Sequence, residues 1–465
     1  MPELPEVETI RNVLKPIVIG RKILAIDVLR KSTIVGSQEA FKESLANETF
    51  LDITRIGKFL IFHLTNHKVF ISHLRMEGKY FDILESESNS KYSRVVFHFD
   101  NGHKLCYDDS RCFGMMKLTD EEHYLKEKDI AQLGPEPFDI KDETYLLNKY
   151  KRINKPIKST LLDQTIMTGL GNIYVDEVLF ATKIHPLTPA SLLSKNDCLN
   201  IVKESQRILN KAINAGGSTI RSYHPGKDID GNFQTELLAY GHKDEPCPNC
   251  EHIMRFKKVG GRGSTYCPIC QIKRGKPLKV AIFGKVSSGK STVLNLFKES
   301  GVATISSDDI VHELYQKEEV IKHINELFHL SKVKLDLDEL REIAKDPKNR
   351  KKLEKYIHPL VKKELIKFME GKHDISVCEV PLLYEAKMDD LFDYIIAIDI
   401  SENKQKARLK ARDALHYQEL MEINKHHLLD INKEKADFII KNDFDIKTLK
   451  KEVKGIINTL QSRLK

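Results

Sequence analysis

A chain of 465 residues is too long for one ordinary core, so its length predicts about two to four domains. Its composition, 41% hydrophobic and 31% charged, is typical of a soluble globular protein. No apolar run approaches the roughly 20 residues that cross a bilayer, which excludes a membrane-spanning protein. The net charge of +8 is mild, but basic residues gather between Glu251 and Lys279, which favours a nucleic-acid partner.

The first 130 or so residues alternate short apolar runs with turns. The opening, MPELPEVE, lacks a basic region followed by an apolar one, so it is not a secretory signal and a cytoplasmic protein is expected. Helical spacing then predicts one helix close to the chain start. The runs KILAIDVL, KFLIFHL, KVFISHL and RVVFHF alternate with period two, which predicts a mostly antiparallel β-sandwich. The sequence Gly134–Pro137 breaks this pattern and marks a domain boundary.

Helical periodicity dominates the next segment, from Ile153 to about Ala215. It is interrupted by Gly169–Asn172, a turn before a second helix, where free backbone N–H groups predict a phosphate-binding site. A polar loop, Gly216–Phe233, follows and is long enough to be functional.

Cysteines then occur in two close pairs, while the other four, Cys106, Cys112, Cys198 and Cys378, are scattered. In a cytosolic chain the paired spacing indicates zinc rather than disulfides. Four thiolates leave no open coordination position, so the zinc is predicted to be structural. The tip of the hairpin between the pairs presents Arg262, either for a phosphate contact or simply to solvent. The four predicted zinc ligands are Cys247, Cys250, Cys267 and Cys270.

After Lys279 the pattern changes to β-rich runs separated by long charged helices, which predicts a parallel α/β sheet. A phosphate-binding loop of the form G-x-x-x-x-G-K-S lies between the first strand and the first helix. In it Lys290 would reach the β- and γ-phosphates of ATP and Ser291 would bind Mg²⁺. The predicted ATP-binding residues of the loop are Gly284, Lys285, Val286, Ser287, Ser288, Gly289, Lys290, Ser291 and Thr292.

Other charged residues of this half have both a functional and an ordinary interpretation. Asp308, after the next strand, could be the base that activates an acceptor hydroxyl, or could simply cap a helix. Arg408 and Arg412 share one helix face and could clamp phosphates, or could form an ordinary basic surface.

The chain start also holds a possible nucleophile. If Met1 is removed, Pro2 carries a secondary amine that is partly neutral at neutral pH and can form an iminium with a sugar aldehyde. Glu3 and Glu6 lie within one turn and could move protons. Composition alone favours an ordinary helix start here.

Residues 1–272 resemble formamidopyrimidine-DNA glycosylase, the bacterial base-excision enzyme for oxidised purines. The resemblance runs in order through PELPEVET, RIGKFL, HLRMEGK, DDSRCFG, LGPEP, GLGNIYVDE, GGSTIRSY and YCPICQ. It implies an N-terminal β-sandwich, a helix–two-turns–helix module and a zinc finger, with damaged double-stranded DNA in the cleft between them. It also implies excision of 8-oxoguanine and formamidopyrimidines, followed by β,δ-elimination as an AP lyase.

The resemblance assigns roles to individual residues. Pro2 would be the Schiff-base nucleophile, Glu3 the proton donor and Lys58 a catalytic lysine that holds a phosphate beside the lesion. The loop Ser218–Tyr223 would close over the extruded base. Arg262 counts with the catalytic set and also grips the DNA backbone, and the further DNA-binding residues would be Met76, Arg111, Phe113, Lys155 and Asn172.

This half departs from the family pattern at Tyr92–Arg94, Ser110 and Cys112, none of which belongs to the catalytic pair. The sister enzyme for oxidised pyrimidines is the alternative within this fold. The start PELPEVE and the set Met76, Arg111 and Phe113 fit the purine enzyme better.

Residues 279–465 resemble dephospho-CoA kinase, which phosphorylates the 3′-hydroxyl of dephospho-CoA with ATP in the last step of coenzyme A synthesis. The phosphate-binding loop, LEKYIHPLV, VPLLYEA, RLKARD and ADFIIKN carry this resemblance. It implies that Asp308 is the base, and that Lys290, Arg408 and Arg412 stabilise the transferred charge.

Departures are larger in this half. Lys285 and Ser287 stand where glycines are usual, and only Asp308 remains of a common pair of carboxylates. Segment 420–430 lacks the usual lid helix, and Asn442 is not followed by the usual glycine. The alternative is therefore a nucleotide-binding but inactive kinase module.

These observations predict a bifunctional cytoplasmic monomer without a membrane partner, whose two halves work independently. Its partners would be damaged DNA, ATP with Mg²⁺, and dephospho-CoA. The predicted domains are a sandwich at 1–133, a helix–two-turns–helix domain at 134–236, a zinc finger at 237–272, a linker at 273–278 and a P-loop kinase at 279–465.

Overall fold

The computed structural model of the protein describes residues 2–142, 144–218, 233–275, 277–331, 333–412, 417–418, 421 and 432–464. The chain forms two compact units, residues 1–243 with 258–266, and residues 244–257 with 267–465. Most of the predicted base-closing loop, Thr219–Tyr223, lies outside the described residues, as do Lys276 and the segment 422–430; the side chain of Arg412 is not described either. Within the described part of the chain, no helix is both long and apolar enough to cross a membrane.

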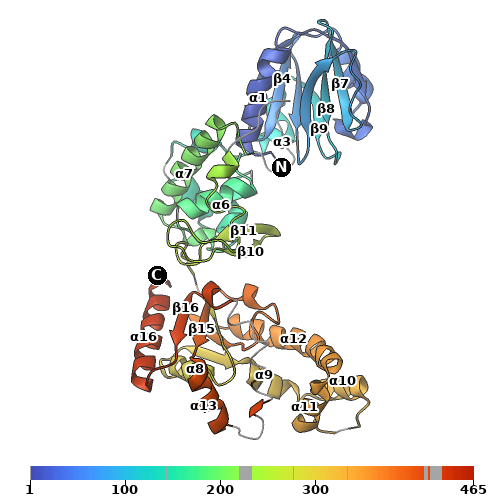
Figure 1. The fold of residues 1–465 in the computed structure, drawn as a ribbon. Helices are drawn as coiled ribbons and strands as arrows, with labels where there is room; N and C mark the ends of the chain where they lie inside the picture. Colours follow the sequence, from blue (N-terminus) through green and yellow to red (C-terminus); the bar gives the residue numbers. More distant parts are fainter. Residues whose placement is uncertain are drawn as a thin grey trace. The chain divides into compact units, whose positions relative to one another are not determined.

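The first unit begins with two packed β-sheets, as Figure 1 shows. One sheet has the strand order β1-β7-β8-β6 and the other β2-β9-β5-β4-β3. The pairings described are antiparallel except for β2 with β9. The strands are β1 (Ile23–Val28), β2 (Ile34–Val35), β3 (Phe50–Ile56), β4 (Phe59–Leu64), β5 (Lys68–His73), β6 (Lys79–Leu84), β7 (Ser93–Phe99), β8 (His103–Asp108) and β9 (Met115–Asp120).

An aromatic core holds these sheets together. Phe50, Phe70 and Phe97 are fully buried, with ring centroids 5.5 to 6.4 Å apart. Phe50 and Phe97 come from β3 and β7, which mix buried residues with half-buried or exposed ones, whereas Phe70 comes from β5, whose last five residues are all buried. The predicted sandwich is therefore confirmed, with helices α1 (Leu4–Val18) and α2 (Gln38–Leu45) beside it.

A separate helical core follows in the same unit. Its apolar residues come mainly from α6 (Asn172–Ala181) and α7 (Lys195–Asn214), with shorter helices around them. Leu4, the first residue of α1, is fully buried in this helical core rather than in the sandwich core. The chain terminus is thereby fixed against α6, which positions the residues beside it. The shorter helices of this core are α4 (Tyr145–Tyr150) and α5 (Ile157–Leu161), whereas α3 (Lys128–Ala131) packs through Ile130 against residues of β4 and β5.

The second unit contains a five-stranded sheet with strand order β13-β14-β12-β15-β16, all parallel. Buried apolar residues lie on both faces of this sheet, and helices cover both (Figure 1). The predicted parallel α/β domain is confirmed. Its strands are β12 (Leu278–Phe283), β13 (Ala303–Ser306), β14 (Ile375–Glu379), β15 (Tyr394–Asp399) and β16 (Phe438–Lys441). Its helices are α8 (Lys290–Glu299), α9 (Ser307–Leu314), α10 (Glu318–Phe328), α11 (Leu337–Lys345), α12 (Pro347–Met369), α13 (Glu402–Arg412) and α16 (Ile446–Ser462).

The cysteine-containing segment is divided between the units. Its two cysteine pairs belong to the second unit, whereas residues 258–266 belong to the first. Strands β10 (Arg255–Val259) and β11 (Arg262–Tyr266) form a two-stranded sheet with Gly260 and Gly261 at its turn. Both glycines have positive φ, 56° and 78°, as a tight hairpin of this length requires.

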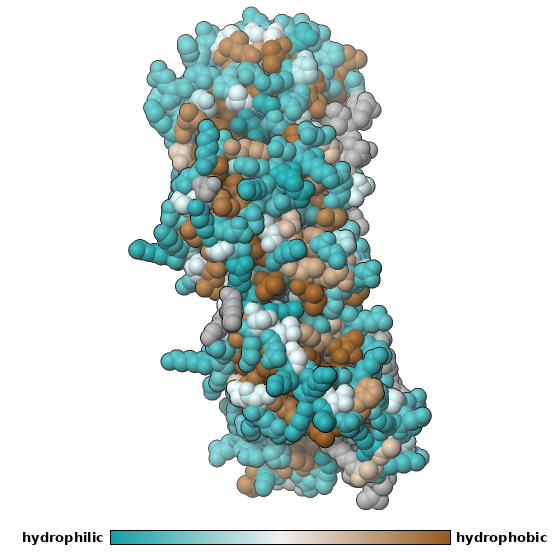
Figure 2. Space-filling model, turned by 90° about the vertical axis from the view of Figure 1, so that its left-hand side faces the viewer, coloured by the Kyte–Doolittle hydropathy of each residue, from teal (hydrophilic) through white to brown (hydrophobic). Residues whose placement is uncertain are grey.

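Hydrophilic side chains cover most of the face in Figure 2, and hydrophobic residues form small separate patches on it. Single exposed apolar residues need no explanation, but a large exposed ring beside charged groups suggests a contact surface. Phe113, whose exposed fraction is 56%, is such a residue.

Candidate functional sites

The first candidate site lies at the amino-terminal end of α1. Pro2 and Glu3 are buried, and α1 begins immediately after them with Pro5 in its first turn. The backbone N–H of Leu4 donates to the carbonyl of Gly169 over 3.1 Å. The chain terminus is thus held between helix α1 and the turn that precedes α6.

The carboxylate of Glu3 lies at the amino-terminal end of α6. It accepts hydrogen bonds from the backbone N–H groups of Gly171 (2.5 Å) and Ile173 (2.9 Å). These donors and the helix dipole favour a negative charge at this place. The Glu3 carboxylate thus occupies two of the N–H groups at the turn where the sequence predicted a phosphate site, and that site stays a prediction.

Lys58 completes this cluster from the turn that precedes β4. Its ammonium group is buried and donates to the carbonyl of Leu170 over 2.7 Å. Burial lowers the pKa of Lys58, although the negative charges of Glu3 and Glu6 oppose this. Burial raises the pKa of Glu3 to about 7, the charge of Lys58 opposes the rise, and that of Glu6 adds to it. Near neutral pH Glu3 can therefore both give and take a proton.

Glu6 has a structural position in the same cluster. Its carboxylate accepts the backbone N–H of Glu3 (2.8 Å), the phenol of Tyr174 (2.5 Å), and both the N–H and the hydroxyl of Ser218 (2.9 Å each). It thus fixes the end of α1, helix α6 and the first residue of the predicted base-closing loop to one another. The sequence had suggested either proton transfer or an ordinary helix start for Glu6.

Gly171 is required by this arrangement. Its φ of −127° suits any residue, but an added Cβ would lie 2.3 Å from the carboxyl carbon of Glu3. We expect Gly171→Ala to displace Glu3, to lower the free energy of unfolding by about 1–3 kcal/mol and to slow base excision by about 10²-fold or more. Urea unfolding and single-turnover kinetics would measure both. Gly455→Ala in α16, where nothing lies within 4 Å, is the control and should be neutral or stabilising by up to about 1 kcal/mol.

The raised pKa of Glu3 also predicts a pH-dependent stability. The folded chain binds this proton more tightly than the unfolded one, so the contribution is present below pH 4.5 and is lost as the pH rises to about 7. At pH 8 we expect Glu3→Gln to unfold with a free energy up to about 3 kcal/mol higher than that of wild type, and at pH 4 with nearly the same one. Calorimetry at both pH values would test this; an equal difference at both would contradict it.

The predicted DNA wedge residues come from two loops at one sheet edge. His73 at the end of β5 pairs with Met115 at the start of β9, so the loop after β5, which holds Met76, lies beside the loop that precedes β9. In that second loop Arg111 and Phe113 are exposed, and the guanidinium lies over the ring at 5.5 Å from its centroid. Asp109 shapes the loop by accepting the N–H groups of Arg111 (2.9 Å) and Gly114 (2.7 Å).

The other predicted DNA contacts lie at the helical core and the hairpin. Asn172 is the first residue of α6, and its buried Oδ1 has no hydrogen-bond partner among the described residues. Arg262 is exposed at the first position of β11 and is close enough to Lys58 to lower the pKa of that lysine. Lys155 is exposed.

The buried lysine of this region is Lys158, which sequence reasoning missed. Its ammonium group is fully buried, 2.7 Å from a carboxylate oxygen of Asp176 and 2.6 Å from the carbonyl of Gly263. Asp176 in turn accepts the N–H of Thr265 over 3.1 Å. These bonds fix β11 to α6 and so hold the strand that carries Arg262. The helical spacing of Lys158 among apolar residues gave no signal of this role.

The second candidate site is a group of four thiols in the second unit. The sulfur atoms of Cys247, Cys250, Cys267 and Cys270 all lie within 4.8 Å of one another. The backbone N–H groups of Asn249 and Cys270 point at two of these sulfurs, at 3.4 and 3.3 Å, as in thiolate sites. Four converging sulfurs fit a tetrahedral zinc ion with no open position.

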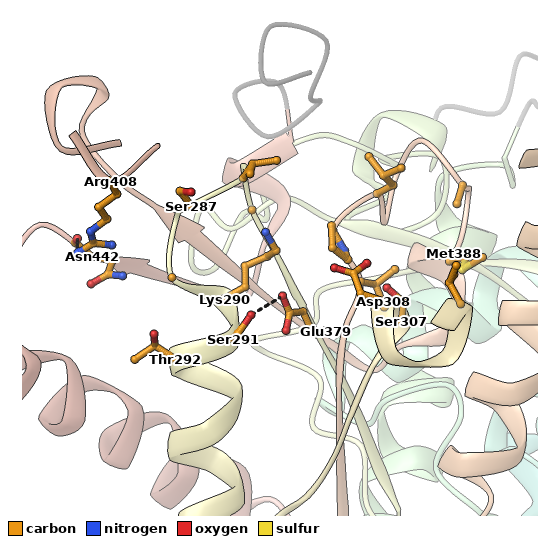
Figure 3. A pocket seen from close by; sticks show the side chains of 18 of the residues that line it. Ser287, Lys290, Ser291, Thr292, Ser307, Asp308, Glu379, Met388, Arg408 and Asn442 are labelled. Carbon is orange, nitrogen blue, oxygen red and sulfur yellow. Dashed lines mark hydrogen bonds between the residues drawn. The ribbon is translucent and has the colours of Figure 1, made fainter. Parts of the chain in front are cut away.

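The third candidate site is a cavity of about 800 Å³ at the carboxyl ends of the parallel strands. The phosphate-binding loop connects β12 to α8 there, as predicted, and Figure 3 shows its side chains. Gly289 has a φ of 97°, and an added Cβ would lie 2.1 Å from the amide nitrogen of Asn442. Ser287 has a φ of 61°, which explains why a glycine would be the easier choice at that position. The hydroxyl oxygens of Ser287 and Ser288 are buried and make no hydrogen bond among the described residues, as expected of a loop built around a ligand.

Two acidic side chains line the cavity near the loop, one from the start of α9 and one from the end of β14 (Figure 3). Asp308, the second residue of α9, lines the cavity, while Ser306 caps that helix by accepting the Asp308 N–H over 3.2 Å. Glu379 ends β14 and accepts the hydroxyl of Ser291 over 3.3 Å. Burial raises the pKa of Glu379, and Lys290 opposes this. Sequence reasoning missed Glu379 because Ser291 and its partner lie far apart in the chain.

Arg408 and Asn442 hold the loop from the opposite side of the cavity (Figure 3). The Asn442 amide donates to the carbonyl of Ser288 over 2.7 Å, and Arg408 donates to the same carbonyl over 3.4 Å. Gln405 of α13 donates to the carbonyl of Val286 over 2.9 Å. Arg408 thus lines the cavity and contacts the loop, and its phosphate-binding role stays a prediction. The further residues lining the cavity include His358, Val380, Pro381, Leu382, Met388 and Phe444.

Three protein-family models match the chain in succession. The formamidopyrimidine-DNA glycosylase N-terminal domain matches residues 1–116, the formamidopyrimidine-DNA glycosylase H2TH domain matches residues 133–224, and dephospho-CoA kinase matches residues 278–448. The predicted order of families is thereby confirmed.

Curated relatives and solved structures match the first part of the chain. Formamidopyrimidine-DNA glycosylases of Ligilactobacillus salivarius and Bacillus licheniformis are 44% and 45% identical to it, over 58% and 59% of this chain and 99% and 100% of theirs. A complex between the Lactococcus lactis enzyme and DNA containing an abasic site is 38% identical, with a TM-score of 0.56, over 58% of this chain and 99% of that one. A structure of the same family in complex with DNA containing carbocyclic 8-oxo-G has a TM-score of 0.55, with 38% identity over the same shares of the two chains.

Proposed function

This chain belongs to the formamidopyrimidine-DNA glycosylase family and carries a dephospho-CoA kinase domain behind it, and from this premise we propose that it is an enzyme with both activities. The first would excise oxidised purines from double-stranded DNA and cut the strand as an AP lyase. The second would transfer phosphate from ATP to the 3′-hydroxyl of dephospho-CoA. The observation that carries the first proposal is the buried cluster of Pro2, Glu3 and Lys58.

We propose that Pro2, freed by removal of Met1, attacks C1′ of the damaged nucleoside while Glu3 donates a proton to the departing base. The bond from C1′ to the base breaks as the bond to the Pro2 nitrogen forms, and the Pro2 nitrogen loses its proton. The C1′–O4′ bond of the sugar then opens with a proton on O4′, which gives an iminium that makes the C2′ proton acidic. Loss of that proton expels the 3′-phosphate, and a second elimination expels the 5′-phosphate. A carboxyl whose pKa is about 7 can both give and take a proton at neutral pH, which suits Glu3 to this work.

DNA contacts follow from the same cluster outward. An enzyme that acts on a base must first take it out of the stack and fill the gap. Met76, Arg111 and Phe113 suit this task because their two loops share one sheet edge. Asn172 and Arg262 are suited to phosphates, and Lys155 and Lys58 remain proposed contacts.

We also retain the predicted domain boundaries, the monomeric state and a cytoplasmic location as proposals.

Two metals belong to the proposal. The four cysteine sulfurs would hold one structural zinc. Ser291 and Glu379 would hold Mg²⁺, since their oxygens meet beside the phosphate-binding loop and Mg²⁺ prefers oxygen ligands. Mg²⁺ supplies charge neutralisation on the phosphates of ATP. In the kinase step Asp308 would accept the proton of the acceptor hydroxyl, while Lys290 and Arg408 steady the transferred phosphoryl group. Arg412 remains a proposed contact.

A paired assay tests the two activities on the same preparation. Purified full-length protein should nick a duplex containing 8-oxoguanine opposite cytosine, and should form CoA from dephospho-CoA and ATP. Cleavage of an oxidised-pyrimidine duplex in preference to the purine one would favour the sister enzyme. Binding of ATP and dephospho-CoA without turnover would favour the inactive kinase module.

A further inference from the structure

Two buried aspartates lie at the amino-terminal edge of the kinase sheet, opposite the cavity. Asp393 immediately precedes β15 and Asp437 immediately precedes β16. Their side chains are 2% and 0% exposed. A carboxylate this deeply buried requires a cation and hydrogen-bond donors to stay charged.

Both cations come from the cysteine-containing segment of the same unit. Arg255, at the start of β10, is ion-paired with Asp437 and also donates to the carbonyls of Asp393 (3.4 Å) and Lys435 (3.2 Å). Lys273, shortly after the second cysteine pair, lies 2.6 Å from a carboxylate oxygen of Asp393. Each cysteine pair is thus followed by one basic residue that neutralises one buried aspartate.

The same two carboxylates connect strands of the kinase sheet. Asp437 accepts the N–H of Ile395 in β15 over 2.6 Å, and Asp393 accepts the N–H of Lys279 in β12 over 3.0 Å. Strand β12 leads into the phosphate-binding loop, and β16 leads to Asn442, whose amide holds that loop. The two aspartates that the basic residues neutralise therefore support the strands that build the proposed ATP site.

Backbone hydrogen bonds around the first cysteine pair position the segment that leads to Arg255. The segment before it is folded back by bonds from Cys247 N–H to the carbonyl of His252 (2.8 Å) and from Met254 N–H to that of Glu245 (2.8 Å). These bonds enclose the first cysteine pair. A zinc ion on the four sulfurs would fix this turn, and with it the guanidinium.

We propose that the cysteine-containing segment is an integral part of the kinase fold: Arg255 and Lys273 neutralise Asp437 and Asp393, so that the kinase sheet depends on the zinc finger. This goes beyond the two proposed activities, and only its metal-dependent part rests on the proposed zinc. It replaces the expectation that the two halves work independently.

Hydrogen exchange of the full-length protein tests the ion pairs. In Arg255→Met, the amides of β15 and β16 should exchange at least about 10-fold faster than in wild type, because Asp437 stays buried without its guanidinium partner and retains only the more distant imidazole of His252, at 3.8 Å. Amides of β4 and β5 should keep their wild-type rates. Lys258→Met, an exposed lysine of the same strand, is the matched control and should change nothing. Unchanged exchange of β15 and β16 in Arg255→Met would overturn the proposal.

Two further variants keep the test decisive if Arg255→Met does not fold. Arg255→Lys retains the charge but loses the fork that reaches three acceptors, so it should show an intermediate increase in exchange. Adding Asp437→Asn to Arg255→Met removes the buried charge and should restore part of the protection. Absence of any rescue in the double variant would count against neutralisation as the role of Arg255.

Chelation tests the metal-dependent part. Full-length protein stripped of zinc should show the same faster exchange in β15 and β16, and its kinase-unit unfolding transition should fall by about 6 °C or more. Zinc content measured on the same samples distinguishes a failure of the proposed metal dependence from a failure of the proposed zinc site. A zinc-loaded protein whose sheet is unaffected by stripping overturns the dependence on metal, whereas a purified protein that never contained zinc overturns the proposed zinc site.

Discussion

Full-length protein in which Pro2 is replaced by Gly, with its terminus acetylated, should form no borohydride-trapped complex with DNA containing 8-oxoguanine. The reaction needs a free amine at the sugar carbon, and the amine of Lys58, the other candidate in the buried cluster, is held by the carbonyl of Leu170 at 2.7 Å. We expect strand cleavage to fall by roughly 10³-fold or more. Denaturing gel electrophoresis after borohydride reduction measures the trapped fraction.

Binding must be separated from chemistry in this experiment. The Pro2 variant should bind a duplex containing a stable abasic analogue within about threefold of wild type, because the wedge residues and Arg262 are unchanged. A variant that still forms the trapped complex would show that the nucleophile lies elsewhere. A wild-type protein that does not trap would remove the glycosylase proposal altogether.

The Glu3→Gln variant separates base excision from the later reaction at the abasic site. Loss of the general acid should slow base excision by about 10²–10⁴-fold, while trapping on a preformed abasic site should persist, since no base has to leave. The wild-type excision rate should fall as the pH rises through about 7, because only the protonated carboxyl donates. That limb of the pH profile should be missing in Glu3→Gln. Glu43→Gln, an exposed glutamate of the same domain, should keep both rate and profile.

Local sequence patterns predicted those parts of the molecule that are determined by residues close together in the chain. The phosphate-binding loop is defined by a strand, a run of small residues and a helix that adjoin in the chain, so its position was predictable. The two cysteine pairs and the alternating strands are equally local. Each of these predictions could be made before any tertiary contact was known.

Long-range contacts explain what was missed. The N–H groups at the start of α6 looked available for phosphate. Glu3, which is 168 residues away from Gly171 in the chain, accepts hydrogen bonds from two of them. Glu379 reaches Ser291 only because β14 lies beside β12 in the sheet. Nothing in the spacing around Arg255 indicates Asp437 as its partner. Sequence reasoning therefore predicted the sites but missed the contacts that connect them.

The kinase offers a comparison between two adjacent carboxylates. Asp308 and Asp309 are consecutive in the first turn of α9 and both are exposed, but of the two only Asp308 lines the cavity. If Asp308 is the base, Asp308→Asn should lower kcat for dephospho-CoA by about 10²–10⁴-fold with the KM for ATP changed less than about threefold. Asp309→Asn should retain wild-type kinetics.

Lys290 distinguishes a working kinase from a module that only binds nucleotide. Its ammonium group lies 3.1 Å from the carbonyl of Lys285, at the loop where the β- and γ-phosphates would lie. In a working kinase Lys290→Met should lower kcat by roughly 10³-fold or more, since the lysine stabilises charge that develops only as the phosphoryl group moves. In a binding module the same change would weaken ATP binding and alter no turnover. Two measurements decide between a working kinase and a binding module: steady-state kinetics and calorimetric ATP titration of wild type, Asp308→Asn and Lys290→Met. A wild type without turnover ends the kinase proposal. An Asp308→Asn variant with full kcat assigns the base to another residue.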